Sequence, residues 1–183
     1  MNAIGHFKTI TRHRHEVIKH CFKAGIPLQG LKHDLSKYTP AEFLSGAKYY
    51  LGTRSPNEAE RDDKGYSSAW LHHKGRNRHH FEYWTDYDRI KRRVEPVEMP
   101  LKYVVEMFCD RVAASKIYNP HNYDDSYPLA YFLRGKDTRF IHPATSDLLE
   151  SWLTMLKDKG EEETFRYIRG LVKKKIKINK NNA

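Results

Sequence analysis

The sequence predicts an all-α protein, a single-domain helical bundle, and three observations lead to this prediction. Apolar residues recur every three or four positions along most of the chain, as they do on the buried face of a helix. No stretch alternates convincingly between apolar and polar residues, so strands should be few. The length of 183 residues and the hydrophobic fraction of 39% suit one compact domain. We expect this domain over residues 1–172 and a basic tail over 173–183.

The first predicted helix runs from about Lys8 to Ala24. Its apolar stripe consists of Ile10, Val17, Cys21 and Ala24. Residues 25–27 (Gly-Ile-Pro) end this helix, because glycine favours a helix terminus and proline cannot continue the helix. A shorter element covers Leu28 to Lys37. Pro40 then begins a third helix, with Thr39 as its cap. Its predicted apolar face consists of Phe43, Leu44 and Ala47.

The middle of the chain is harder to assign. Residues 52–65 are polar and rich in turn formers, which predicts a surface loop or a weak helix. A helix that ends at Gly75 follows. Its spaced residues are Tyr66, Ala69, Trp70 and His73. Residues 77–93 are rich in histidine, aromatic residues and arginine, and they fit no regular element.

A central helix is predicted from Pro100 to about Tyr118. It is apolar nearly all round, as helices surrounded by the core are. Its apolar residues are Leu101, Val104, Val105, Phe108, Val112 and Ile117. Two more helices are predicted over Thr145 to Lys157 and Glu161 to Lys175.

The chain is basic, with a formal net charge of +10. This excess favours phosphate-bearing partners: small phosphorylated substrates or nucleic acid. The run from Lys173 to Lys180 holds five lysines and no acid, so it accounts for half of the imbalance.

The cysteines and the N-terminus point to a cytoplasmic protein. Cys21 and Cys109 fall in apolar helical patterns and form no CxxC pair, so we expect buried thiols in a reducing compartment. The N-terminus lacks the apolar segment of a signal peptide. The sequence contains no stretch of 18 apolar residues, so it predicts no membrane span.

Eleven histidines outnumber the eight phenylalanines, and several fall on the first helix. His15 and His20 are five residues apart, about 140° around a helix, which excludes the zinc-binding HExxH motif. His13 lies on the apolar stripe, where it is either a core histidine or a metal ligand. His20 lies about 10 Å further along the helix, so it should not reach the same ion.

Three further features supply metal-ligand chemistry. His33-Asp34 offers a neutral nitrogen beside an anionic oxygen, which suits a divalent cation. The histidine pairs at 72–73 and 79–80 bracket a basic turn. They belong either to a solvated loop or to a metal or phosphate site. Asp110 lies in the most apolar helix, where a carboxylate needs a metal, an ion pair or exposure to water.

This order of residues resembles the HD-domain superfamily of metal-dependent phosphohydrolases. In that superfamily a helix-borne histidine, a His-Asp pair and a distant aspartate hold the metal, and some branches add histidines and a second ion. The string HDLSK at residues 33–37 is similar to an HDxxK variant of the motif. The resemblance covers about residues 8–118. The strings HDLSKY and HHKGRN also look like those of a family of small bacterial and phage proteins, a likeness that does not indicate a reaction.

The resemblance implies a site and a mechanism. The implied metal ligands are His13, His33, Asp34 and Asp110. His72 or His73, with His79 or His80, would bind a second metal or contact the leaving group. The implied cofactor is a divalent ion: Mn, Fe, Ni, Co, Zn or Mg. Ser36 and Lys37 stand where single-metal nucleotidases often place a water-activating glutamate, which leaves that role unassigned.

The expected function is therefore hydrolysis of a nucleotide or another small phosphate ester. Asp34 would orient the attacking water, and His73 or His80 would protonate the leaving oxygen. The cations expected to neutralise the phosphate are Lys37, Lys74, Arg76, Arg78 and Arg111. The alternatives are a metal or nucleotide binder without catalysis, and a basic nucleic-acid-binding protein.

Overall fold

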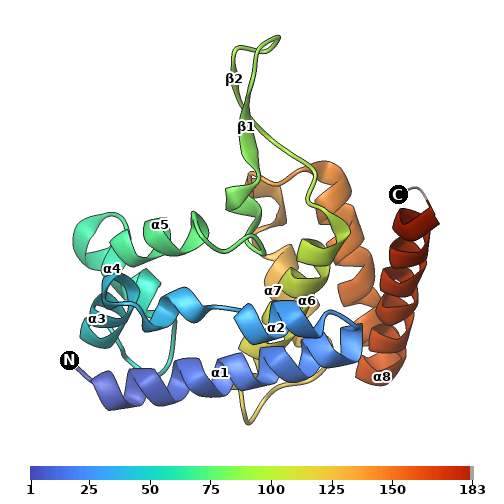
Figure 1. Ribbon diagram of the computed structural model, residues 1–183. Coiled ribbons are helices and arrows are strands. Elements are labelled where there is room, and N and C mark those ends of the chain that lie inside the picture. Colours follow the sequence, from blue (N-terminus) through green and yellow to red (C-terminus); the bar gives the residue numbers. More distant parts are fainter. Residues whose placement is uncertain (182–183) are drawn as a thin grey trace.

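The computed structural model describes residues 1–181 of the chain. Over this range the protein has eight α-helices and one two-stranded hairpin, which confirms the predicted all-α class (Figure 1). The helices are α1 (Ala3–Ala24), α2 (Pro27–Lys32), α3 (Pro40–Lys48), α4 (Pro56–Lys64), α5 (Ser68–Lys74), α6 (Leu101–Tyr118), α7 (Tyr127–Leu133) and α8 (Pro143–Asn181). The strands are β1 (Thr85–Asp88) and β2 (Arg93–Pro96), and short 3₁₀ helices cover Leu35–Tyr38, Phe81–Tyr83 and Lys136–Thr138.

The hydrophobic core surrounds α6, which packs against α1 and α8. The buried apolar residues of α6 are Val104, Val105, Met107, Phe108, Cys109, Val112, Ala113 and Ile117. Neighbours in this list point in different directions around the helix, so α6 is enclosed nearly all round, as predicted. The Phe108 ring meets the rings of Trp152 and Phe165 edge-on, with centroids 6.1 and 5.5 Å apart. This packing fixes α6 relative to α8.

The first helix differs from its prediction only at its start. It begins at Ala3 rather than Lys8, because the side chain of Asn2 accepts a hydrogen bond from the backbone N–H of Gly5 and caps it. The predicted stripe is buried, and both cysteines are free buried thiols.

The second predicted element does not continue to Lys37. Helix α2 ends at Lys32, and the chain turns sharply at His33 and Asp34 before a 3₁₀ turn begins at Leu35. Asp34 has a left-handed conformation, with φ at 54°, which aspartate tolerates better than most residues. One element was predicted over Leu28 to Lys37 because the spacing of apolar residues does not reveal a turn of the backbone at a single residue.

The face predicted for α3 was also partly wrong. Leu44 is 58% exposed, and the inward positions belong to Glu42, Gly46 and Ala47. Thr39 precedes the helix as predicted, but its hydroxyl donates to the Ser36 carbonyl instead of capping the helix. A glutamate thus faces inward from α3, whereas the leucine that the apolar pattern placed inward is exposed.

The segment between α3 and α6 contains both expected and unexpected structure. Residues 56–64 form α4, which was the weak-helix alternative, and Tyr66 lies exposed before α5. The unassigned residues 77–93 contain strand β1, which pairs antiparallel with β2 at the end of this stretch, with Thr85 opposite Pro96. This hairpin projects from the helical body (Figure 1).

The C-terminal region differs from its prediction in two ways. It has one additional helix, α7, and its last helix, α8, is longer than predicted. Helix α7 contains Pro128, which favours a turn in a sequence-based assignment. The last two predicted helices are the two arms of α8, which is interrupted at Gly160 where φ is 79°. The second arm continues through residue 181, so most of the predicted tail is helical, and residues 182–183 lie outside the described range. No helix in residues 1–181 is both long and apolar enough to cross a bilayer.

A buried glutamate joins α4 to α5. Glu60 is fully buried and accepts hydrogen bonds from the hydroxyls of Ser67 and Ser68, at 2.7 and 2.6 Å, and from Lys64 at 3.0 Å. Burial by itself would raise the pKa of Glu60, but these bonds outweigh it and lower the pKa to about 2.

We expect Glu60→Gln to lower the free energy of unfolding at pH 7 by about 1–3 kcal/mol, because it weakens bonds to a buried charge. The folded pKa lies below the ordinary value of 4.5, so this stabilisation is present above pH 4.5 and disappears as the pH falls toward 2. Urea unfolding from pH 7 to pH 2.5 measures it. The two proteins should converge in acid, and a constant difference across this range would contradict the assignment.

Candidate metal centre

Side chains from five separate parts of the chain meet between α1, α5 and α6. They are His13 of α1, His33 and Asp34 of the turn after α2, His73 of α5, His79 and His80 of the following loop, and Asp110 of α6. These residues form two groups that share Asp34, and within each group the ligand atoms lie within 4.8 Å of one another. Either group could hold a metal ion.

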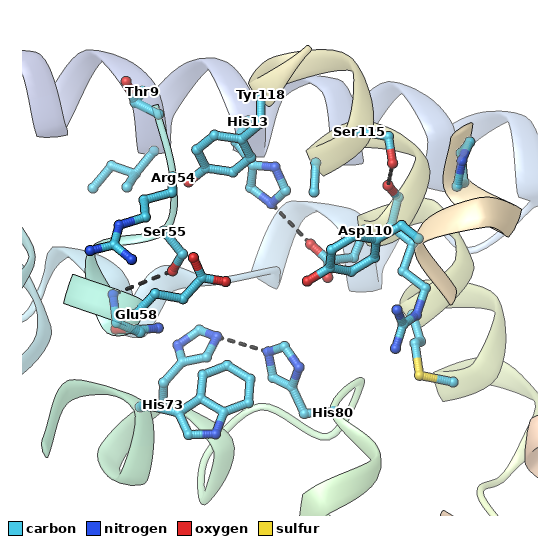
Figure 2. A pocket seen from close by; sticks show the side chains of 18 of the residues that line it. Thr9, His13, Arg54, Ser55, Glu58, His73, His80, Asp110, Ser115 and Tyr118 are labelled. Carbon is cyan, nitrogen blue, oxygen red and sulfur yellow. Dashed lines mark hydrogen bonds and ion pairs between the residues drawn. The ribbon is translucent and has the colours of Figure 1, made fainter. Parts of the chain in front are cut away.

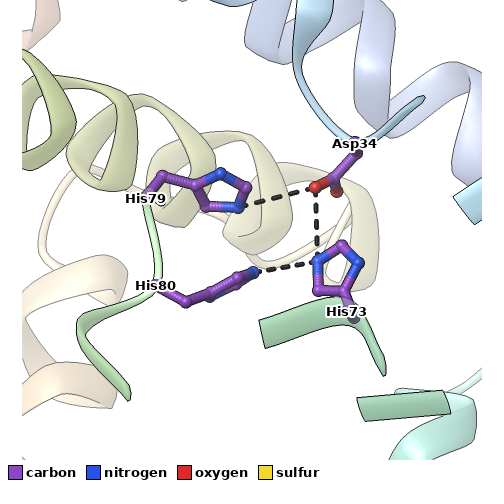
Figure 3. Close-up of side chains that lie close together, drawn as sticks. All are labelled: Asp34, His73, His79 and His80. Atoms are coloured by element: carbon purple, nitrogen blue, oxygen red, sulfur yellow. Dashed lines mark hydrogen bonds and ion pairs between the residues drawn. The ribbon is translucent and has the colours of Figure 1, made fainter. Parts of the chain in front are cut away.

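Asp34 lies between the two groups because of its left-handed backbone. Its Oδ2 lies 3.3 Å from Nε2 of His33, whereas its Oδ1 lies 3.3 Å from Nε2 of His73 and 3.5 Å from Nε2 of His79. Figure 3 shows Oδ1 facing His73 and His79. The two oxygens of one buried carboxylate therefore face opposite sets of imidazoles.

The first group consists of His13, His33, Asp34 and Asp110. Nε2 of His13 is 2.9 Å from Oδ1 of Asp110, and Nε2 of His33 is 3.5 Å from the same oxygen. Ligands about 2.0–2.2 Å from one ion lie roughly 3.0–3.5 Å apart, so these spacings match a shared ion. His20 lies elsewhere, against the Cys109 carbonyl, as the axial spacing predicts.

The second group consists of Asp34, His73, His79 and His80. The Nε2 atoms of His73 and His80 are 2.9 Å apart (Figure 3). A third set, His33, His79 and Glu106, also has metal-binding distances. We assign Glu106 a different role, because it contacts the opposite nitrogens of these rings.

Two buried glutamates orient three of the imidazoles. Oε1 of Glu106 lies 3.0 Å from Nδ1 of His33 and 3.2 Å from Nδ1 of His79. Oε2 of Glu42 lies 2.7 Å from Nδ1 of His73. Each Nδ1–H therefore donates to a carboxylate, which directs Nε2 toward Asp34 as a free ligand. Carboxylates hold metal-binding histidines in this way.

The electrostatics of Glu106 fit this role. Burial would raise its pKa, but hydrogen bonds from His33 and His79 outweigh burial and lower the pKa to about 2. Gln29 donates a further hydrogen bond to Oε2 at 2.8 Å. Glu106 is thus an anion that only accepts hydrogen bonds, surrounded by donors.

Buried atoms without hydrogen bonds give an independent test of metal fit. In the described part of the chain, Nε2 of His33, Nε2 of His79 and Oδ1 of Asp34 are buried and make no hydrogen bond. Buried polar atoms normally have partners. Nε2 of His33 faces the first group, whereas the other two atoms face the second group. Neutral imidazole nitrogens and carboxylate oxygens are suitable ligands for a divalent ion, so the residues fit a metal.

The structure brings most of the predicted ligands together, with His72 as the exception. Its Nδ1 lies 2.7 Å from Oε1 of Glu42, and it belongs to neither group. Lys37 reaches the centre, with its ammonium 2.6 Å from Oδ2 of Asp34. Burial tends to lower the pKa of Lys37, but the charges of Asp34 and Asp110 outweigh it and raise that pKa.

The predicted phosphate-neutralising cations divide into two sets. Lys37 and Arg111 line a cavity of about 740 Å³ that adjoins the centre. Lys74, Arg76 and Arg78 lie outside that lining. Arg76 is exposed and donates to the His72 carbonyl, and exposed Arg78 donates to the hydroxyl of Tyr103.

The cavity has walls of mixed chemistry. Figure 2 shows the His13–Asp110 pair and the His73–His80 pair among its lining side chains. Further polar lining residues are Thr9, Arg54, Ser55, Asn57, Glu58 and Arg61. A volume of this size fits a small organic ligand.

Several functional positions escaped the sequence-based prediction. Glu106 precedes Asp110 by four residues, so both lie on one side of α6, and this spacing could have indicated it. Glu42 had no comparable signal, because its role depends on how α3 packs against α5. The cavity arginines outside α6 were missed because they lie in loops and short helices.

Comparisons with known proteins identify a family without an assigned activity. The family model described as "Family of unknown function (DUF5662)" matches residues 2–155, and the chain belongs to this family. No curated protein and no solved structure matches the chain.

Proposed function

We propose that this member of the DUF5662 family is a metal-dependent phosphohydrolase that acts on a small phosphate ester of nucleotide size. One observation carries the proposal. The imidazoles of His33, His73 and His79 are each held at Nδ1 by a buried glutamate, and their Nε2 atoms face the two oxygens of Asp34. A pair of metal ions bridged by a carboxylate explains both features.

The donor set favours particular ions. The first group offers two imidazoles and two carboxylates, and the second offers three imidazoles and one carboxylate. Imidazole suits iron, nickel and zinc better than magnesium, which prefers oxygen ligands, and the carboxylates of the two groups also suit manganese. We therefore propose two divalent transition-metal ions with Asp34 between them.

The residues of the chain would bind and orient the substrate. When bound, divalent ions polarise a phosphoryl oxygen and acidify water. Lys37 and Arg111 line the cavity beside the centre, where their charges favour a phosphate over a neutral group. The buried positions of His33 and Asp34 limit access of bulk water, which strengthens these interactions.

The test is hydrolysis by protein loaded separately with manganese, iron, cobalt, nickel and zinc. We expect cleavage of 4-nitrophenyl phosphate that a chelator abolishes and that added metal restores. His33→Ala should abolish this hydrolysis. The control His15→Ala changes an exposed histidine of α1 outside both groups and should retain it.

Two other outcomes would replace this proposal. A folded, fully metallated protein that is inert toward a broad panel of phosphate esters would indicate a metal-binding protein without catalysis. Nucleic-acid binding through α8, whose Lys173, Lys174, Lys175 and Lys177 are exposed, predicts an affinity that falls steeply with salt and does not depend on His33.

A further inference from the structure

The cavity beside the metal centre is much larger than one phosphate group requires. Its volume of about 740 Å³ leaves room for a whole small molecule. One side of the lining, made by α6, α7 and the segment after α7, contributes Arg111, Arg134 and Arg139. These three residues are here called the arginine cluster.

The arginine cluster is held in place by the protein itself. Cζ of Arg111 lies 5.7 Å and Cζ of Arg139 lies 5.0 Å from the centroid of the Phe132 ring. Arg139 also donates to the backbone carbonyls of Tyr131 and Phe132, which anchors it to the end of α7. Two guanidinium groups therefore share one aromatic ring and need not be ordered by a ligand.

The positive charge of this cluster is not neutralised by ion pairing. Among residues 1–181, no carboxylate forms an ion pair with Arg111, Arg134 or Arg139. Nε of Arg111 is buried and makes no hydrogen bond.

Two other cations of the cavity lining form ion pairs. Arg54 pairs with Asp62 at 2.5 Å, and Lys37 pairs with Asp34. Two carboxylates of the cavity lining, Glu82 and Asp110, act electrostatically on the Arg111–Arg139 pair. Oε2 of Glu82 is buried without a hydrogen bond. Glu82 and Asp110 carry two negative charges against the three positive charges of the cluster, so the cluster keeps an excess of positive charge.

We propose that the arginine cluster is a second phosphate subsite, so that the substrate is a small bisphosphate. The metal centre would take the phosphate that is hydrolysed, and the cluster would take the other, in the same cavity. Guanidinium groups suit this role because each can bind phosphate through two N–H groups. This inference rests on the proposed function, but binding to the cluster can be measured without turnover.

Binding of phosphonates that cannot be hydrolysed tests the subsite. Alkane-α,ω-bisphosphonates of graded length are compared with alkylphosphonates of matched length by calorimetry, using metal-loaded full-length protein at fixed ionic strength. We expect at least one bisphosphonate to bind about tenfold more tightly than its matched monophosphonate, as one strong charge-assisted contact provides. The best length would report the distance between the two subsites.

Three variants make the test specific. Arg139→Gln and Arg111→Gln should each bring the ratio of the two affinities close to one. Arg166→Gln removes the same charge from the exposed face of α8 and should leave the ratio unchanged. Two variants are needed because Arg139 also anchors α7, so loss of that variant's fold, seen by thermal unfolding, leaves Arg111→Gln to decide.

The outcomes separate this inference from the proposed function. No preference for any bisphosphonate, or a preference that persists in both cluster variants, would overturn the subsite even if aryl phosphate is hydrolysed. A preference that requires the cluster, in a protein that hydrolyses nothing, would support the subsite and overturn the phosphohydrolase.

Discussion

Asp34→Asn is expected to abolish binding of the two proposed metal ions and the proposed metal-dependent hydrolysis. The two oxygens of this carboxylate face the two ligand groups, so one substitution damages both. The loss of affinity should exceed the roughly 10–100-fold effect of removing a supporting carboxylate. Asparagine also tolerates the left-handed backbone at this position, so the turn itself should persist. Elemental analysis of the purified variant measures the bound metal.

Two controls separate this effect from general damage. Asp158→Asn removes an exposed carboxylate of α8 and should leave the metal content unchanged. His13→Ala removes a ligand of the first group only, so we expect about half of the metal to remain. If Asp34→Asn retained the full metal content while folded, a bridging role for this residue would be wrong.

Glu106→Gln is expected to weaken metal binding by about 10–100-fold, although Glu106 itself would not touch an ion. The carboxylate accepts hydrogen bonds from His33, His79 and Gln29. A glutamine carbonyl in place of Oε1 is a neutral and weaker acceptor for both imidazoles, and its NH2 group then faces the donor of Gln29. The Nε2 atoms of His33 and His79 would then be less well fixed toward Asp34.

Metal titration of the chelator-treated protein measures this change. Glu162→Gln is the matched control, because that glutamate is 91% exposed and its only ion pair in the described chain is with Arg166. A normal metal affinity in folded Glu106→Gln would show that the two histidines need no orienting carboxylate. Equal losses in both variants would point to a general charge effect.

The part of the site that could be predicted from the sequence is the part fixed by helical periodicity. His13 lies on a clear apolar stripe and was expected to face the interior. Asp110 lies in the most apolar helix, which made a metal-bound carboxylate one of its predicted alternatives. The pair His33-Asp34 could be identified by its chemistry. The backbone turn at Asp34, where the carboxylate lies between the two groups, could not. The likeness to HD-domain phosphohydrolases remains a prediction.

The rest depends on tertiary contacts that no local pattern encodes. The sequence left open which members of the two histidine pairs face the centre, and for His72 and His73 the packing of α5 against α3 decides it. His73 and His72 both contact Glu42, but only His73 also reaches Asp34. The cavity lining could not be predicted either, because it combines loops with short helices such as α4 and α7.

The most direct test of the central claim is anomalous diffraction from crystals of the manganese-loaded protein. We predict two peaks about 3.5–4 Å apart on either side of the Asp34 carboxylate. One peak should be bound by His13, His33 and Asp110, and the other by His73, His79 and His80. Manganese bound elsewhere, or a fully loaded crystal with no peak beside Asp34, would contradict this account.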